Sequence, residues 1–368
     1  MAISIFLRTV TIYLTTKDLI LLAMKLRAAA LALALCATTF IQPANASYNG
    51  VIDYSNTRIV PMFRDLNQPS PGWSGYLYAP RIIFTAGHGE LNFDSNGNKI
   101  DYSNLPAYAG LPNSKVSNDS KKFAVVKKWV STSMRYDNAT LGDFAIYVVG
   151  EDIADVPRAK LATREIAKEL EAARAIVEIT GYGDYQDRCK EGDQLPCPEM
   201  NNSRSLEPRK LKVQLRPYED FISLVGYERP QLKTSQLTWG GGKISPCGGD
   251  SGGSVTTTYK GEEIYLSVTP NGMNGYACGA TGYFDGKGGI GYASPIYDHL
   301  DILKEAEDFV AAALAQEAIE KAKAKPSPTP TPTPIAAPKK STITCVKGKT
   351  AKKVTAVSPK CPNGFKKK

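Results

Sequence analysis

Residues 245–254 read Ser-Pro-Cys-Gly-Gly-Asp-Ser-Gly-Gly-Ser, and they are the part of this chain best suited to chemistry. Most glycine clusters are turns. With each residue type at a frequency of about 7%, however, Gly-Asp-Ser-Gly-Gly arises by chance about once per million positions. The run therefore indicates that Ser251 is a nucleophile. A serine hydroxyl needs a base to take its proton, and usually a carboxylate to fix the tautomer of that base.

The partners of such a serine can be chosen by elimination. The chain has two histidines, and His299 falls in a predicted C-terminal helix with acids on either side. His88 follows the apolar run Arg81–Ala86, so it is the better candidate for the base. Asp143 opens the apolar run 143–149, where burial of an unpaired charge would cost several kcal/mol. An imidazole beside Asp143 would remove that cost, and the alternative is an aspartate that faces solvent.

Three short motifs carry a resemblance to a known family. Thr-Ala-Gly-His88, Asp143-Phe-Ala-Ile and Gly-Asp-Ser251-Gly-Gly resemble the active-site signatures of the chymotrypsin/trypsin-like serine proteases, in the same order, over roughly residues 47–305. The resemblance implies that His88 is the general base, that Asp143 orients it and that Ser251 attacks the scissile carbonyl. The backbone N–H groups of Gly249 and Ser251 would form the oxyanion hole. We expect a serine endopeptidase that forms an acyl-enzyme and uses no metal and no cofactor.

The resemblance also suggests a substrate pocket. Ser245 would form its floor, Ser267 would correspond to the family serine near the triad carboxylate, and Thr269 would stand in a wall. A neutral floor does not offset the desolvation of a cation, so it favours apolar or aromatic substrate side chains. Asp285 could restore a preference for Arg or Lys if it entered the pocket.

The sequence departs from the family pattern at two places. Gly89 stands where the family usually has a cysteine, so the disulfide beside the histidine is missing. The family pairs a new amino terminus with the acid before the nucleophile, which is Asp250 here. Three alternatives remain open: the end left by signal cleavage near residues 47–51, a cut between Arg58 and Ile59, or another partner for Asp250.

The N-terminal region predicts export. Lys25 and Arg27 precede an apolar run of 14 residues (28–41) and the small-residue site Ala44-Asn45-Ala46. That run is short of the roughly 20 residues that span a bilayer, so we expect a cleaved signal within residues 1–46, with Met24 as the initiator. The mature protein would be secreted, and could associate with the cell surface, without a stable membrane span.

The cysteines fit an oxidising compartment. Cys36 lies within the predicted signal, and six cysteines remain, which allow 15 pairings. Pairing within sequence neighbourhoods predicts three disulfides: Cys189–Cys197, Cys247–Cys278 and Cys345–Cys361. The family resemblance also implies the Cys247–Cys278 bond, as a brace for the substrate pocket.

Short apolar or alternating runs between turn signals predict an antiparallel β-barrel or sandwich over residues 47–295. The clearest runs are 74–78, 81–86, 122–130, 143–149, 175–180, 209–215 and 262–268. The resemblance sharpens this all-β prediction to two antiparallel six-stranded barrels, with a Gly-aromatic-Gly turn at residues 181–183 opening the second. Helices are predicted over residues 163–174 and from about residue 297 to 325.

The C-terminal region has a different composition. We expect the protease domain to occupy residues 47–305, a helical extension 306–325, a disordered Pro/Thr linker 326–338 and a disulfide-closed tail 339–368. The tail holds ten Lys and no acid, so the net charge of +9 leaves 9 − 10 = −1 for the rest of the chain.

The tail suggests an anionic cell-wall or surface polymer as a partner, in addition to protein or peptide substrates. A purely solubilising tail is the simpler alternative. Nucleic acid is not expected, because the basic charge lacks a platform with interleaved aromatic residues. Two other functions remain open for the whole chain: a catalytically silent protease homologue, and a surface-interaction protein that acts through the tail.

Overall fold

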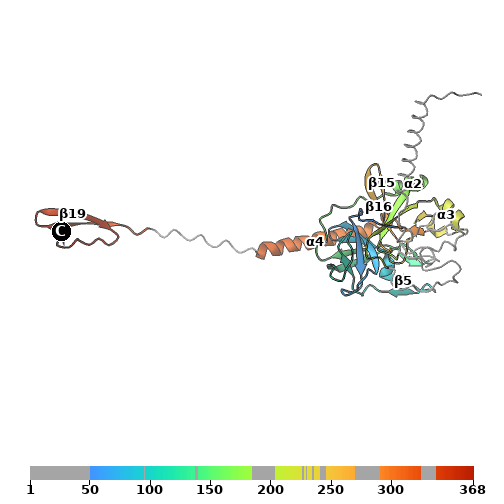
Figure 1. Cartoon of the computed structure of the whole chain (residues 1–368), viewed down its shortest axis with the longest axis horizontal. Coiled ribbons are helices and arrows are strands. Elements are labelled where there is room, and N and C mark those ends of the chain that lie inside the picture. The colour runs from blue at the N-terminus through green and yellow to red at the C-terminus, as the bar shows by residue number, and fades with distance from the viewer. Residues whose placement is uncertain are drawn as a thin grey trace, which may run out of the picture. The chain divides into compact units, whose positions relative to one another are not determined.

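The computed structural model describes residues 50–94, 96–136, 140–184, 204–225, 228, 230–233, 236–240, 246–269, 291–324 and 337–368 (Figure 1). The predicted signal, nearly all of the predicted linker, and Cys189, Cys197, Ser245, Cys278 and Asp285 lie outside these residues. The chain divides into two compact units between Ala311 and Ala312, inside helix α4 (Leu300–Ala324). The division falls later than the predicted boundary after residue 305, since the first turns of α4 contribute buried side chains to the core.

The first unit contains a closed antiparallel barrel of six strands. Its order is β11-β4-β3-β2-β7-β8. The strands are β2 (Ile59–Phe63), β3 (Trp73–Ala79), β4 (Ile82–Thr85), β7 (Tyr108–Gly110), β8 (Lys122–Val130) and β11 (Ala145–Val149). The predicted strand 122–130 has the same bounds as β8, and the other predicted barrel strands agree with β3, β4 and β11 to within one or two residues at each end.

Strand β11 shows why the barrel sequence reads as unbroken apolar runs. Ala145, Tyr147 and Val149 point into the barrel core. Ile146 and Val148 point the other way, into a second apolar cluster that includes β16 and the start of α4. Both faces of the strand are buried, so neither face selects polar residues. Asp143 precedes this doubly buried strand by two residues.

The remaining large sheet has five strands in the order β1-β13-β12-β15-β16. The strands are β1 (Val51–Ile52), β12 (Ile176–Gly181), β13 (Arg209–Gln214), β15 (Ser254–Tyr259) and β16 (Glu262–Val268). A separate ladder pairs β14 (Leu237–Trp239) with β17 (Gly291–Ala293). The protein is thus mostly β with one closed barrel, and the described strands do not show the second closed barrel that the family resemblance implied.

Small elements complete the first unit. The hairpins are β5 (Leu91–Phe93) with β6 (Lys99–Asp101), and β9 (Arg135–Tyr136) with β10 (Thr140–Leu141). The predicted helix 163–174 is α2 (Arg164–Ala172), whose N-cap Thr163 accepts a hydrogen bond from the N–H of Ile166. Helix α3 (Tyr218–Val225) was not predicted. Among the described helices, none is both long enough and apolar enough to cross a membrane.

The C-terminal residues form a small antiparallel sheet in the order β19-β18-β20. Its strands are β18 (Ser341–Lys347), β19 (Thr350–Ala356) and β20 (Lys366–Lys367). The predicted Cys345–Cys361 disulfide is present, with the Cα atoms 5.6 Å apart, and Cys345 is fully buried. The sequence predicted only a disulfide-closed tail, because so short a segment contains too few apolar residues to indicate a sheet.

His299 belongs to the core and not to the surface. It immediately precedes α4, and its ring stacks on Phe144 with the centroids 4.5 Å apart. Its Nε2 lies 2.7 Å from Ser294 Oγ, and the residue is 1% exposed. Burial lowers the pKa of His299 to about 4, so the ring is neutral near pH 7. The neutral ring therefore packs against Phe144, the residue that follows Asp143.

The burial of His299 predicts a loss of stability in acid. The folded-state pKa of about 4 lies below the ordinary value of 6.5, so below pH 6.5 the unfolded chain binds the extra proton. The free energy of unfolding should therefore fall by roughly 2–3 kcal/mol between pH 7 and pH 4.5 through this group alone. Urea titrations at both pH values measure this fall. In His299→Leu the free energy of unfolding should fall by roughly 2–3 kcal/mol less than in the parent protein. An unchanged pH dependence in the variant would contradict this role for His299.

Candidate active site

The strand register of the barrel brings His88 and Asp143 together. Strands β4 and β11 are antiparallel neighbours, with Thr85 opposite Ala145. His88 lies in a short 3-10 helix (Gly87–Gly89) just after β4, and Asp143 lies just before β11. The end of one strand therefore meets the start of the other. His88 Nδ1 is 2.7 Å from Asp143 Oδ2, and the backbone N–H of His88 donates to Oδ1 at 2.8 Å.

The environment sets the charges of this pair. Burial lowers the pKa of His88, but the charge of Asp143 and its hydrogen bond more than offset that effect, so the pKa of His88 is raised above 6.5. Burial raises the pKa of Asp143, while the charge of His88 and hydrogen bonds from His88 and the Gly87 N–H lower it below its ordinary value. An ionised Asp143 holds the proton on Nδ1 and leaves Nε2 as the proton acceptor.

Ser251 lies on a turn that begins near Cys247 and leads into β15. The carbonyl of Ser251 accepts a hydrogen bond from the Ser74 N–H at 2.9 Å. On the other side, the Gly252 N–H donates to the Thr269 carbonyl at 2.7 Å, and the Thr269 N–H donates to Gly253 at 2.6 Å. The turn is therefore held between barrel strand β3 and the end of β16.

Gly252 lets this turn approach the backbone that leads to His88. Its φ is +82°, and a Cβ there would lie 2.2 Å from both Ser74 O and Thr85 Oγ1 and 2.9 Å from the Ala86 nitrogen. No other residue type fits both the angle and the space. The structure thus places the turn that carries Ser251 against the segment that ends in Gly87 and His88.

Gly249, which the sequence suggested for the oxyanion hole, has an unusual backbone geometry. Its φ is +91°, in the region that favours glycine. Its carbonyl accepts a hydrogen bond from Ser74 Oγ at 2.8 Å, and Ser74 Oγ in turn accepts one from the Tyr182 N–H at 2.8 Å. This bond fixes the peptide group that follows Gly249, and a bond from the Asp184 N–H to the Gly248 carbonyl, at 2.8 Å, fixes the peptide group that precedes it.

Asp250 is fully buried and has backbone donors. Its Oδ1 accepts from the Gly183 N–H and its Oδ2 from the Cys247 N–H, both at 2.8 Å. Ile59 is a fully buried residue of barrel strand β2, paired with Tyr76, so a cut before it would place a charged amino group inside the barrel. The structure therefore favours a partner other than Ile59 for Asp250, and backbone N–H groups supply part of that role.

The predicted pocket residues occupy different places. Ser267 is buried, and its hydroxyl donates to the carbonyls of Val268 and Ser294, whereas the hydrogen bonds described for Asp143 come from His88 and Gly87. Thr269 is fully buried and contacts the Ser251 turn through its backbone. Cys247 is disulfide-bonded, and Ser245 and Cys278 lie outside the described residues.

Arg204 is a residue of the site that the sequence did not indicate. It pairs with Asp184 in an isolated β-bridge, and its Nε lies 3.5 Å from Asp184 Oδ1. Its guanidinium lies so close to Gly249 that a Cβ on that glycine would come within 1.3 Å of Nη1. A positive charge therefore lies beside the turn whose N–H groups would bind an oxyanion. No local pattern joins Arg204 to Gly249, so only the fold reveals the contact.

Glu90 holds the His88 segment in place of the missing disulfide. Its side chain is fully buried and makes ion pairs with Arg64 at 2.8 Å and Lys128 at 2.9 Å, and Tyr147 OH donates to it. Arg64 also donates to the carbonyl of Gly89, which stands where the family has its cysteine. The bracing that a disulfide would supply comes here from a buried cluster of charged groups.

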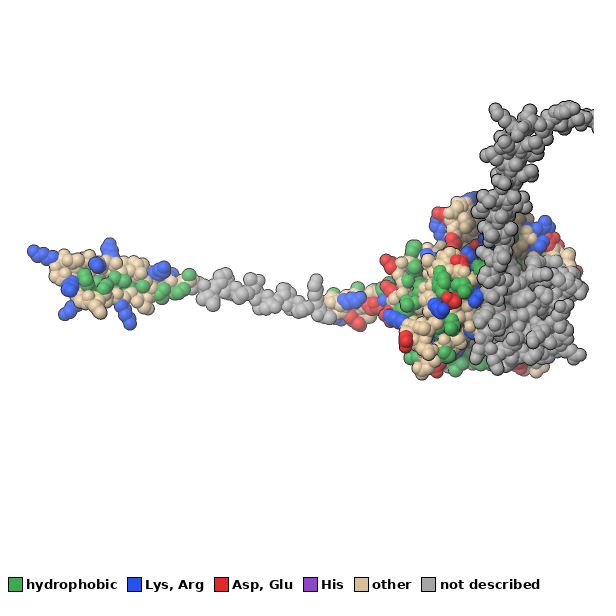
Figure 2. All heavy atoms as spheres, viewed as in Figure 1, with side chains coloured by type: hydrophobic (Ala, Val, Ile, Leu, Met, Phe, Trp, Pro, Cys, Tyr) green, Lys and Arg blue, Asp and Glu red, His purple; other side chains and the backbone are tan. Residues whose placement is uncertain are grey.

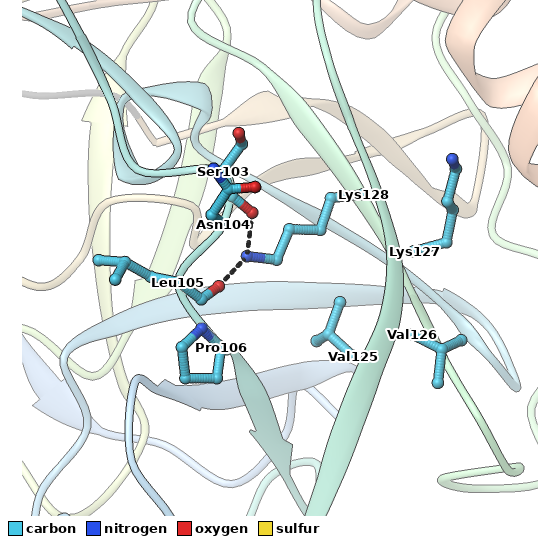
Figure 3. A pocket seen from close by; sticks show the side chains of 8 residues that line it. All are labelled: Ser103, Asn104, Leu105, Pro106, Val125, Val126, Lys127 and Lys128. Carbon is cyan, nitrogen blue, oxygen red and sulfur yellow. Dashed lines mark hydrogen bonds between the residues drawn. The ribbon is translucent and has the colours of Figure 1, made fainter.

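Lys128 extends this bracing to a neighbouring loop. Its Nζ donates to the carbonyls of Ser103 and Leu105, at 3.4 and 2.5 Å, beside the pocket lined by residues 103–106 and 125–128 (Figure 3). The Tyr102 N–H donates to the Glu90 carbonyl at 2.7 Å. The side chain of Glu90 thus ties the segment after His88 to the barrel, and its carbonyl ties that segment to the loop at Tyr102.

The chain matches no protein-family model, and no curated protein matches it. The closed six-stranded antiparallel barrel is compatible with the trypsin-like fold that the motifs resemble. Among the residues that the structure describes, no group of three or more His, Cys, Asp or Glu side chains is placed to hold a metal ion.

The Glu90 cluster gives a stability prediction. Glu90→Gln removes a buried charge and leaves Arg64 and Lys128 without their partner, so the free energy of unfolding should fall by roughly 3–5 kcal/mol. The matched control is Glu262→Gln, which breaks the ion pair between Glu262 and Lys160. Both of these side chains are about 60% exposed, so this variant should change the free energy of unfolding little. Urea unfolding of both variants tests this, and equal effects from the two would contradict a bracing role for Glu90.

Proposed function

We propose that this protein is a serine endopeptidase of the chymotrypsin/trypsin type. The observation that carries the proposal is the buried His88–Asp143 pair, with the hydrogen bond on Nδ1, beside a turn that presents Ser251. A histidine with its Nδ1 fixed by a carboxylate is organised to accept a proton at Nε2. The structure places no other histidine near this turn in that arrangement, because the neutral His299 is used in packing.

The proposed reaction proceeds in two halves. Ser251 Oγ attacks the carbonyl carbon of the scissile bond while its proton passes to His88 Nε2, and Asp143 stabilises the imidazolium that forms. His88 then gives this proton to the departing amine, which leaves an acyl group on Ser251. A water molecule attacks the ester, with His88 as base, and the carboxylic acid product is released with Ser251 restored.

The developing negative charge needs donors that are already in place. The backbone N–H groups of Gly249 and Ser251 are the proposed donors, and each such donor is worth about 3–4 kcal/mol in acyl transfer. The positive φ of Gly249 and the hydrogen bond to its carbonyl support this assignment. The Arg204 guanidinium adds a favourable charge beside the same turn.

The strand pairing supports a two-barrel architecture. Isolated bridges join Leu215, just after β13, to Trp239 of β14, and Ser267 of β16 to Pro295, just after β17. These two bridges connect β13 and β16 of the five-stranded sheet to the β14–β17 ladder. A circuit β12-β13-β14-β17-β16-β15 of six strands would follow if the bridges extend into ladders.

Several features support an exported enzyme. Residues 24–46 resemble a secretory signal. The Cys345–Cys361 disulfide and the disulfide-bonded state of Cys247 fit an oxidising compartment. Within the proposed function, Ser245 at the pocket floor favours apolar or aromatic side chains before the cleaved bond. A catalytically silent homologue is the alternative, and the preserved His88–Asp143 geometry argues against it.

Digestion of a peptide library tests the activity and the preference together. We expect the parent protein to cleave chiefly after apolar or aromatic residues, and Ser251→Ala to lower turnover by several orders of magnitude because the nucleophile is gone. Circular dichroism of the variant checks that it is folded. Full activity in Ser251→Ala would refute the nucleophile. Cleavage chiefly after Arg or Lys would refute the neutral pocket, and Asp285→Asn would then be the next variant.

The raised pKa of His88 predicts the pH profile. His88 must be neutral to accept the Ser251 proton, so kcat/KM should rise with pH through an apparent pKa above 6.5. Asp143→Asn removes the charge that raises this pKa and the acceptor that fixes the tautomer, so it should lower kcat/KM at every pH and shift any residual profile to lower pH. A profile that is flat between pH 5 and 8 would contradict His88 as the base.

A further inference from the structure

The strand register places three lysines on each face of the C-terminal sheet, with Lys347, Lys352 and Lys367 on the face of Cys345, and the two faces differ in what covers them. On one face, Cys345 is bonded to Cys361, and the Lys352 ammonium lies 5.6 Å from the centre of the Phe365 ring. Lys347 of β18 belongs to this face too, and its Nζ lies near Gly364. The segment between β19 and β20 therefore covers this face, and Cys345 beneath it is fully buried.

The opposite face is lined by lysine and threonine. Residues that pair directly across antiparallel strands share a face, and here Thr344 pairs with Lys353 and Val346 with Lys366. The Lys368 N–H donates to the Thr344 carbonyl at 2.9 Å, which continues the same register. We call Lys353, Lys366 and Lys368, with the threonines 342, 344 and 355 between and beside them, the lysine face.

The spacing on this face follows from strand geometry. Lys353 and Lys368 flank Thr344 from the two outer strands, about 10 Å apart, and Lys366 and Lys368 are about 7 Å apart along one edge. All three lysines are exposed. The threonine hydroxyls at 342 and 355 lie 2.7 Å apart. The lysine face thus carries cations on its two outer strands, with Thr344 on the central strand between them and the hydrogen-bonded pair Thr342 and Thr355 beside them.

The positive charge of residues 339–368 has no compensation within that stretch. Residues 339–368 contain ten Lys and no Asp or Glu, so no acid within that stretch can pair with them. The side of the sheet seen in Figure 2 shows Lys side chains with no acidic side chain among them. Like charges on neighbouring strands destabilise a sheet, and an external anion would remove that repulsion.

We propose that the lysine face binds a linear polyol-phosphate polymer. Lysine presents a compact point charge that suits single phosphates, whereas carboxylate recognition favours the arginine fork, and this segment has ten Lys and no Arg. The face has no aromatic residue on which a nucleic-acid base could stack. Its apolar residues are the half-buried Val346 and the small Ala351, so it offers little apolar surface to a bilayer. Phosphates would meet the lysines while polyol hydroxyls meet the threonines.

This proposal does not depend on the endopeptidase function, and its test can use an inactive chain. The full chain carrying Ser251→Ala is titrated with soluble poly(glycerol phosphate) of defined length, at several salt concentrations. The face variant combines Lys353→Gln, Lys366→Gln and Lys368→Gln. The control combines Lys347→Gln, Lys349→Gln and Lys360→Gln, which removes the same charge away from the face. Mapping of the Cys345–Cys361 peptide pair checks that the sheet is intact.

The face variant should bind at least about tenfold more weakly than the parent and show a salt slope smaller by about three, since each phosphate-contacting lysine contributes about one. The control should stay close to the parent in both respects. Equal losses in the two variants, or no binding by the parent, would overturn the proposal in favour of a solubilising tail. Equally tight binding of single-stranded DNA or of phosphatidylglycerol vesicles would overturn the choice of polymer.

Discussion

The position of the turn that carries Ser251 depends on one buried residue of the barrel, Ser74. Its N–H donates to the Ser251 carbonyl, its hydroxyl donates to Gly249 and accepts from Tyr182, and its carbonyl accepts from Thr85 Oγ1. Ser74 is fully buried in β3, so these four bonds cannot be exchanged for water without cost. Through these bonds the turn that carries Ser251 is held against β3, which is the neighbour of β4. The segment that contains His88 begins at the end of β4.

The electrostatics of the site follow from the same arrangement. The Asp143 carboxylate lies just before β11, which is buried on both faces, and burial of its charge without a partner would be unfavourable. The pairing of β4 with β11 brings His88 beside Asp143 and offsets that cost. The buried Glu90 cluster then holds the chain on the far side of His88. His88, Asp143 and the turn that carries Ser251 are therefore fixed by strand pairing and buried polar contacts. The proposed acyl transfer would require such preorganisation.

The sequence could predict what local pattern encodes. Strands β8 and β16 were predicted with their observed bounds because polar turns frame them, and His88, Asp143 and Ser251 lie in motifs of fixed spacing. Ser74, Glu90 and Arg204 could not be found, since each acts through contacts with segments distant in sequence. The C-terminal sheet was missed because its stability rests on a disulfide and few apolar residues. The described strands show one closed barrel, and the isolated bridges next to the five-stranded sheet have no counterpart in the sequence periodicity.

If His88 activates Ser251 as proposed, a fluorophosphonate should react with that serine. The reagent forms a phosphonyl ester with an activated serine, and peptide mapping by mass spectrometry locates the adduct. We expect one adduct, on the peptide that contains Ser251, which forms faster as pH rises through the pKa of His88 and is absent in His88→Ala. A folded protein that remains unlabelled, or that is labelled at another serine, would contradict it.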